Sequence, residues 1–113
     1  MKNKTDKRIR LKAKIRARIK GTAERPRLSV FRSNKFIYAQ VIDDVSGKTL
    51  AQANDIKTKK GTKTERAKIV GRLIADTCSK IKIDKVVFDR NGFKYTGRIK
   101  TVADEARAAG LKF

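Results

Sequence analysis

The chain has 113 residues, of which 31 are Lys or Arg and 11 are Asp or Glu, and its formal net charge is +20 at pH 7. This length is enough for one domain and leaves no room for a second. Charge on this scale repels itself in a compact fold and indicates a polyanionic partner, because solubility alone needs a net charge of only about 2 to 8. Nucleic acid is the commonest such partner, since neutralising its phosphates releases condensed counterions.

The same composition excludes several kinds of chemistry. The chain has no His, so it cannot build a His-based catalytic triad or use a His general base. Its single Cys, Cys78, excludes a disulfide framework within the chain and a Cys-based structural zinc site. The N-terminus has no apolar run of signal-peptide or membrane-span length. We therefore expect a cytoplasmic protein that needs no metal and no cofactor.

A basic arm, residues 1–21, opens the chain. Cationic and apolar side chains alternate along it, and Leu11, Ile15 and Ile19 recur every four residues, which lines them along one side of a helix. Helix nucleation is costly and neighbouring cations repel one another, so the arm should be largely unfolded alone and fold on a polyanion, with Gly21 as its stop. The arm residues predicted to bind nucleic acid are Arg8, Arg10, Arg16, Arg18 and Lys20.

Residues 22–113 form the predicted globular domain, which begins with three strands. Pro26 disfavours helix at the residue before it, and apolar side chains alternate with others over residues 28–31. A second β-rich run covers residues 36–42 and a third covers residues 49–53, each after a turn of Ser, Asn, Asp or Gly residues. Short connections join antiparallel neighbours, so the three strands should form a meander.

A long helix is predicted over residues 64–82. Thr62 and Glu65 stand at the spacing of a capping box, just before apolar residues begin to recur with a helical period. Cys78, on the apolar face, is most simply a small core residue. The predicted face consists of Val70, Leu73, Ile74, Thr77, Cys78 and Ile81.

The last elements are a strand over residues 84–89, a loop over residues 90–97 and a second helix over residues 98–109. Gly110 follows in the C′ position, where glycine commonly ends a helix. The resulting order is β-β-β-α-β-α. It predicts an α/β (α+β) sandwich in which the helices cover one face of the sheet.

The carboxylates do not indicate catalysis. Asp43 and Asp44 are adjacent, and a turn rich in Asp, Ser and Gly explains them. Asp89 stands at the end of a predicted strand and is accompanied by cations at positions 90, 94 and 98, so we expect it to form an ion pair rather than to act as an acid. A Gly-x-x-x-x-Gly-Lys phosphate loop is absent. No catalytic residue is predicted, and the chain is not expected to be an enzyme.

Candidate nucleic-acid contacts also occur outside the arm. Arginines bracket the first strand and their planar forks suit phosphate, although charges at a strand edge also prevent aggregation. Tyr38 can stack on a base or pack within the sheet. The basic loop over residues 57–63 leads into the N-terminus of the long helix, which favours anions, although the loop can also be simply solvated. In the loop over residues 90–98, basic and aromatic residues alternate around two glycines that would let the backbone approach a phosphate, although this segment can also be only a turn. The predicted contacts are Arg25, Arg27, Arg32, Ser33, Asn34, Tyr38, Lys57, Lys59, Lys60, Arg90, Asn91, Lys94, Tyr95 and Arg98.

Two long segments resemble a known family. The stretches "RPRLSVFRSNKFIYAQVIDD" (residues 25–44) and "VVFDRNGFKYTGRIKTVADEARAAGLKF" (residues 86–113) are similar to the bacterial large-subunit ribosomal protein eighteen family, the 5S-rRNA binders. The resemblance covers essentially the whole chain. Asn91 stands where the family usually has a second Gly, and Thr96 where His is common; Asn tolerates the left-handed region better than most residues.

The resemblance implies a domain of ribonuclease-H-like topology with a basic N-terminal arm, but not ribonuclease activity, because clustered acidic residues are missing. It implies a structural role in the central protuberance of the large ribosomal subunit. There the protein binds 5S rRNA and helps attach it to 23S rRNA, beside neighbouring 5S-binding ribosomal proteins. Neither a membrane nor a second copy of the chain is an expected partner.

Three other functions are alternatives. A nucleoid-type basic DNA-binding protein fits the charge, although the sequence shows no helix-turn-helix arrangement. The arm could lie on an anionic membrane, but its apolar face is narrow and lacks Trp and Phe. A nuclease would require the clustered carboxylates that the sequence lacks.

Overall fold

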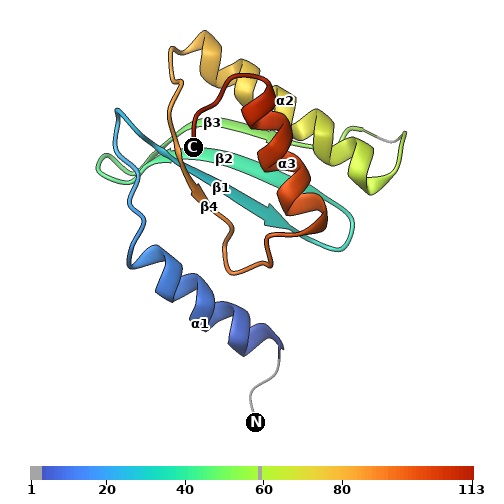
Figure 1. Ribbon diagram of the computed structural model, residues 1–113, viewed down its shortest axis with the longest axis horizontal. Coiled ribbons are helices and arrows are strands. Elements are labelled where there is room, and N and C mark those ends of the chain that lie inside the picture. The colour runs from blue at the N-terminus through green and yellow to red at the C-terminus, as the bar shows by residue number, and fades with distance from the viewer. Residues whose placement is uncertain (1–3, 59) are drawn as a thin grey trace.

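The structure is a computed structural model that describes residues 4–58 and 60–113 (Figure 1). These residues contain one four-stranded mixed sheet and three helices, in agreement with the predicted α/β class. The predicted contact Lys59 lies outside the described residues. In chain order the elements are α1 (Lys4–Arg16), β1 (Arg27–Arg32), β2 (Ile37–Asp43), β3 (Lys48–Asn54), α2 (Lys63–Lys80), β4 (Val87–Asp89) and α3 (Gly97–Ala108).

The sheet has the strand order β3-β2-β1-β4. The first three strands form the predicted antiparallel meander, and β4 pairs in parallel with β1 at the edge. β4 is shorter than predicted because the preceding segment leaves β1: Lys85 forms an isolated parallel bridge with Lys112 of the C-terminal tail. Strand β1 is therefore central, with its start beside β4 and its end at the β1–β2 turn.

Helices α2 and α3 cover one face of the sheet (Figure 1), as predicted. Alternate residues of β1, such as Leu28 and Val30, are fully buried beneath them, whereas their neighbours face the other side. Cys78 is buried in this core, as predicted, and burial raises the pKa of its thiol to about 11. The largest fully buried apolar residues of the core are Leu28, Ile37, Ile74, Ile99, Val30, Val41, Val70, Val86 and Val102.

The start of α2 agrees with the prediction, but its buried face is rotated. The Thr62–Glu65 capping box is present, with the Glu65 N–H donating to Thr62 Oγ1 at 3.2 Å. Leu73 and Ile81, expected in the core, are each 45 % exposed. The reason is that α3 crosses α2 at Gly71, where a Cβ atom would lie 2.7 Å from the Val102 carbonyl oxygen. The close helix contact buries the small residues Gly71 and Ala75 in addition to Val70 and Ile74, and it leaves Leu73 exposed.

The end of α3 agrees with the prediction as well. Gly110 has a φ of +115°, its N–H donates to the Arg107 carbonyl, and the Leu111 N–H donates to the Ala106 carbonyl. This pair of hydrogen bonds is the Schellman pattern that glycine at C′ permits. The reversal sends the C-terminal tail back along β4. Among the described residues, none of the helices combines the length and apolar character that a bilayer span requires.

The arm differs from the prediction in where its helix stops. α1 ends at Arg16, and Ile19 lies beyond it, although Leu11 and Ile15 are half-buried as the helical spacing predicted. Gly21 is not a helix stop: a Cβ there would lie 2.5 Å from both the Arg27 nitrogen and the Ile42 carbonyl oxygen. Its lack of a side chain lets the chain lie directly against the sheet. The arm was expected to be largely unfolded alone; in the structure α1 rests on the domain, a contact that an isolated arm lacks.

Candidate nucleic-acid interface

The start of β1 holds a buried network of charges. Arg27 is only 5 % exposed. Its Nε and Nη2 donate to the two carboxylate oxygens of Asp44 at 3.0 and 3.1 Å, and its Nη1 donates to Asp89 Oδ2 at 2.8 Å. Asp89 is fully buried, and Arg16 lies 3.9 Å from the same oxygen. The prediction that Asp89 forms an ion pair is confirmed, but its partners are Arg27 and Arg16 rather than the cations that follow it in sequence.

This network determines the role of Arg27. Burial opposes the charge of Arg27, but hydrogen bonds to Asp44 and Asp89 outweigh burial and raise its pKa. The hydrogen bonds from Arg27 hold the pKa of Asp44 below its usual value, although burial opposes this effect, and the Gly21 N–H lowers it further. Because each of its three side-chain nitrogens donates a hydrogen bond inside the protein, Arg27 joins β1 to its neighbours, and the predicted RNA contact at this residue is not supported by its buried position.

The loop after β4 is also held from within. The Asn91 N–H donates to Asp89 Oδ1 at 2.9 Å, and the Asn91 side chain donates to Ser29 Oγ at 2.6 Å and to the Val30 carbonyl at 2.9 Å. Asn91 has a φ of +52°, a left-handed conformation that Asn adopts more readily than most residues. Asn91 is buried, so its predicted RNA contact is not supported either; its side chain ties the loop to β1.

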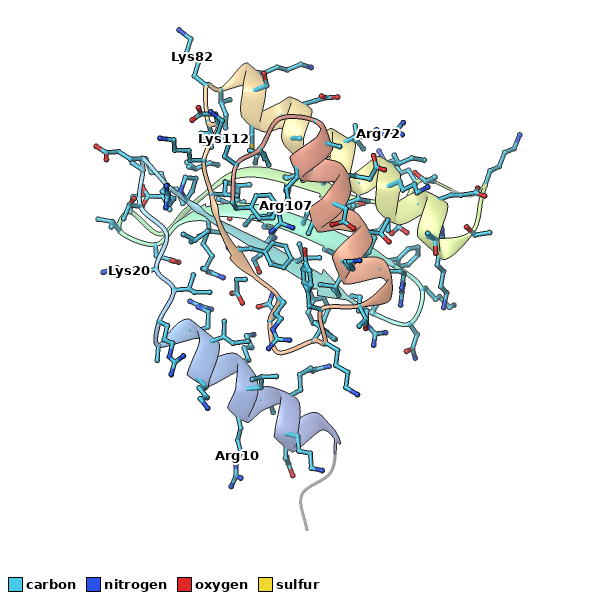
Figure 2. The ribbon with its side chains drawn as sticks, viewed as in Figure 1. Arg10, Lys20, Arg72, Lys82, Arg107 and Lys112 are labelled. Atoms are coloured by element: carbon cyan, nitrogen blue, oxygen red, sulfur yellow. The ribbon has the colours of Figure 1, made fainter. Side chains whose placement is uncertain are left out.

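Gly92 and Phe93 of this loop support the arm. A Cβ at Gly92 would lie 2.5 Å from the Arg8 carbonyl oxygen, so only glycine lets α1 come so close. The guanidinium of Arg8 stands 4.9 Å from the Phe93 ring centroid, and that of Arg32 stands 5.2 Å from it. One buried aromatic ring therefore brings a cation of the arm next to a cation of β1. Figure 2 shows that Arg10 and Lys20 project away from the domain.

The sheet face opposite α2 and α3 carries polar and aromatic side chains. Ser29 pairs with Gln40 and Phe31 with Tyr38 across β1 and β2. Phe31 is 42 % exposed, and its ring centroid is 6.1 Å from that of Tyr38. These four residues and Ser33 line an open hollow of 370 Å³. Tyr38 is half-buried, so it packs against Phe31 and also borders this hollow.

The β1–β2 turn lies at the end of this face. The Ser33 N–H donates to the Phe36 carbonyl at 2.9 Å, and the Phe36 N–H donates to Ser33 Oγ at 3.1 Å, so the Ser33 side chain shapes the turn. Asn34 is exposed at its tip. Arg98 Nη2 donates to the Ser33 carbonyl at 3.1 Å, which brings the start of α3 to the turn.

The remaining predicted contacts are spread over the surface. Arg25, Lys57, Lys60 and Lys94 are exposed and Arg90 is half-buried. Tyr95 belongs to a different cluster: its ring packs edge-on against Phe88, and its hydroxyl accepts a hydrogen bond from Arg107 Nη1 at 3.0 Å. The fold thus brings together the arm, the end of β1 and the start of α3, and it does not bring Tyr95 to them.

Sequence reasoning missed Arg66 and Phe93. Arg66 Nη2 donates to the Lys35 carbonyl at 3.4 Å, so a helix residue reaches the β1–β2 turn. An Arg inside an amphipathic helix carries no sequence signal for such a contact, whereas the alternation of basic and aromatic residues did point to the Phe93 loop. The described residues contain no group of three or more His, Cys, Asp or Glu side chains that could hold a metal ion.

Comparisons with known proteins agree with this picture of a basic, non-catalytic domain. Residues 2–113 match the family described as ribosomal L18 of archaea, bacteria, mitochondria and chloroplast. The large ribosomal subunit protein uL18 of Sorangium cellulosum is 60 % identical over 112 residues, covering 94 % of each chain. The large ribosomal subunit protein uL18 of Bacteroides thetaiotaomicron is 54 % identical over 114 residues and covers all of both chains. The chain therefore belongs to the ribosomal L18 family, a family of structural RNA-binding proteins of the ribosome rather than of enzymes.

Proposed function

We propose that this protein is a constituent of the large ribosomal subunit in the cytoplasm, where it binds 5S rRNA and helps attach it to 23S rRNA in the central protuberance. Neighbouring 5S-binding ribosomal proteins would be its other partners. The relatives named as large ribosomal subunit proteins support the assignment of this protein to the large subunit. The observation that carries the proposal is the net charge of +20 on a chain of that family, because an excess of this size requires a polyanion for its compensation.

The likeness to the family also supports a ribonuclease-H-like topology for the domain. The parallel pairing of β4 with β1, at the edge of an antiparallel meander, fits that topology. We also propose a division into an arm, residues 1–21, and a globular body, residues 22–113; α1 adds no strand or helix to the sheet and its two covering helices, although it contacts the Gly92 loop (Figure 1).

The contact surface in this proposal comprises the arm, the sheet face that α2 and α3 leave uncovered, and the β1–β2 turn with the starts of α2 and α3 beside it. Exposed cations of the arm, among them Arg10, Arg18 and Lys20, neutralise phosphates. The open sheet face with Phe31 and Tyr38 fits the shape and hydroxyl groups of the RNA, which dominate the recognition of double-stranded RNA because its major groove is too narrow to read. The proposed contacts are Arg8, Arg10, Arg16, Arg18, Lys20, Arg25, Arg32, Ser33, Asn34, Tyr38, Lys57, Lys60, Arg90, Lys94 and Arg98.

The test is the affinity of the full chain for 5S rRNA as a function of salt. If about 8 phosphates are neutralised, the logarithm of the binding constant should fall with the logarithm of salt concentration with a slope of about −6 to −7. A competition with duplex DNA of equal length distinguishes the nucleoid alternative. Affinity for 5S rRNA that hardly changes with salt, or equal affinity for the DNA, would contradict the proposal.

A further inference from the structure

Three arginines from distant parts of the chain meet at the β1–β2 turn. Arg32 ends β1, Arg66 lies in the second turn of α2 and Arg98 lies in the first turn of α3. Arg98 donates to the Ser33 carbonyl at 3.1 Å and Arg66 donates to the Lys35 carbonyl at 3.4 Å, so both guanidiniums reach the same turn. We call Arg32, Arg66 and Arg98 the arginine cluster.

Positive charge in this cluster exceeds negative charge. Asp55 is the only carboxylate in ion-pair contact with any of the three arginines among the described residues, and its Oδ2 lies 3.6 Å from Arg66 Nε. Its other oxygen accepts the Ile37 N–H at 2.9 Å. Burial lowers the pKa of Arg98, and the charges of Arg32 and Arg66 lower it further, while Asp55 opposes them. The three arginines therefore lie near one carboxylate, that of Asp55, in a partly buried position.

The donors of the cluster are only partly used inside the protein. A guanidinium has five N–H donors, and Arg98 uses Nη2 on the Ser33 carbonyl. Arg98 Nη1 is enclosed without an acceptor among the described atoms, and Arg66 Nε is enclosed beside Asp55 Oδ2 at 3.6 Å. These two atoms are out of reach of a ligand, whereas Arg32 is exposed and Arg66 and Arg98 keep part of their side chains at the surface. The excess charge at this surface calls for an anion with several oxygens.

We propose that the arginine cluster binds one phosphate group of the RNA backbone, with Asp55 as the positioning residue that holds Arg66. The inference rests on the proposed function, since it names a particular phosphate site within the RNA contact surface. The guanidinium of Arg32 also packs on the Phe93 ring, which Arg8 of the arm contacts as well, so the cluster is continuous with the arm. Arg98 approaches from the start of α3, where Thr96 makes no side-chain capping bond and the first turn has no acidic residue, so the helix end adds positive potential.

The ordinary alternative is that Arg66 and Arg98 only fasten α2 and α3 to the turn. The sharpest test compares Arg66→Gln with Arg72→Gln. Both arginines lie on α2 and each pairs with one carboxylate, but Arg72 is mostly exposed and pairs with Glu105, away from the turn (Figure 2). The two substitutions remove the same charge. Arg66→Gln should weaken binding to 5S rRNA about tenfold and make the salt slope less steep by about 1, whereas Arg72→Gln should change affinity less than about twofold.

Arg98→Lys gives a second readout, because it keeps the charge while removing the guanidinium. Lys lacks the planar set of N–H donors, so it loses both the bond to the Ser33 carbonyl and the donors that remain for a phosphate. RNA affinity should therefore fall several-fold while the salt slope stays close to that of the wild type. Because Arg66→Gln leaves Asp55 buried without its partner, the double variant Asp55→Asn/Arg66→Gln serves as a folded form in which the loss of affinity should persist.

The outcomes separate the two proposals. If the wild-type chain does not bind 5S rRNA, the proposed function fails. If the wild type binds and Arg66→Gln, the double variant and Arg98→Lys all behave like Arg72→Gln, the phosphate site alone is overturned. Equal tenfold losses in Arg66→Gln and Arg72→Gln would also overturn it, because they would reflect net charge rather than a site. Thermal unfolding of every variant establishes that the binding assays use folded protein.

Discussion

The two ends of strand β1 each carry a cluster of arginine and aspartate, and the clusters differ in their balance. At the start, Arg27 and Arg16 stand beside two carboxylates, Asp44 and Asp89, and the donors of Arg27 are occupied at 2.8 to 3.1 Å. At the other end, Arg32, Arg66 and Arg98 gather around Asp55 alone. Both ends involve charge brought out of water, which is unfavourable unless it is paired.

The difference indicates how the two ends are used. Where carboxylates satisfy the guanidinium, as at Arg27, the charge belongs to the fold, and removing it should destabilise the protein. Where arginines outnumber carboxylates, we propose that a ligand completes the charge, so removing it should weaken binding. Whether an arginine stabilises the fold or binds a ligand therefore depends less on the number of arginines nearby than on the number of acceptors that they already have in the protein.

The largest expected effect is on stability at the Arg27 end. Arg27→Gln leaves the fully buried Asp89 without its short ion pair, so the free energy of unfolding should fall by about 3 to 5 kcal/mol. Chemical denaturation at pH 7 measures this loss. The same measurement on Arg32→Gln is the control at the other end of the strand. A loss at Arg27 below about 1 kcal/mol would mean that Arg27 is not part of the fold, and the contrast would disappear.

Gly21→Ala should have the next largest effect. The added methyl group would lie 2.5 Å from the Arg27 nitrogen and the Ile42 carbonyl oxygen, both of which are backbone atoms of the sheet. Overpacking of this kind costs about 1 to 3 kcal/mol. Gly47→Ala is the control for backbone strain alone, since Gly47 has a φ of +70° but a Cβ there meets nothing within 4 Å. A Gly21→Ala variant as stable as the wild type would show that the segment at Gly21 can move away from β1.

Lowering the pH should decrease the free energy of unfolding, because Asp44 at the Arg27 end becomes protonated. The folded pKa of Asp44 lies below its usual value of 3.8, so Asp44 stabilises the fold fully above that pH and loses its contribution as pH falls toward the folded pKa. Unfolding free energies measured from about pH 5 down to about pH 2 should fall less steeply in Asp44→Asn than in the wild type. Asp104→Asn, an exposed residue on α3, is the control. Identical slopes for wild type and Asp44→Asn would refute this role.

The smallest expected effect on stability is at the exposed Arg32. Arg32→Gln should change the free energy of unfolding by no more than about 1 kcal/mol, because the exposed Arg32 has no ion pair among the described residues and loses only its contact with the Phe93 ring. Its affinity for 5S rRNA should nevertheless fall several-fold. Denaturation and RNA binding on the same preparation measure both quantities. A variant that loses stability but keeps RNA affinity would reverse the assignment of the two ends of β1.

Most of the fold was predictable because its signals are local. The alternation in β1, the capping box at Thr62 and the glycine after α3 each depend on neighbouring residues, and all three are confirmed. The errors occurred where packing decided the outcome. Leu73 was expected inside because it fits the helical period, but the close crossing at Gly71 rotated the buried face of α2 away from it.

For the candidate site, the sequence predicted that many cations bind RNA but could not predict which of them do so. Arg27 and Arg32 are indistinguishable by sequence, since each is an arginine at one end of the first strand. Asp44, Asp89 and Asp55, the carboxylates that separate their roles, come from other parts of the chain, and only folding brings them close. Arg66 could not be recognised at all, because nothing local marks a helix arginine that reaches a distant turn.

The sequence by itself determined the class of this protein: a small α/β domain with a basic arm, without catalytic groups, whose charge requires a polyanion. Charge and periodicity are properties of the chain that survive any fold, and for that reason they could be read directly. The tertiary structure decided which cations are available. It satisfied Arg27 with two carboxylates and left Arg32, Arg66 and Arg98 sharing one, because acceptors are distributed in space and not along the sequence.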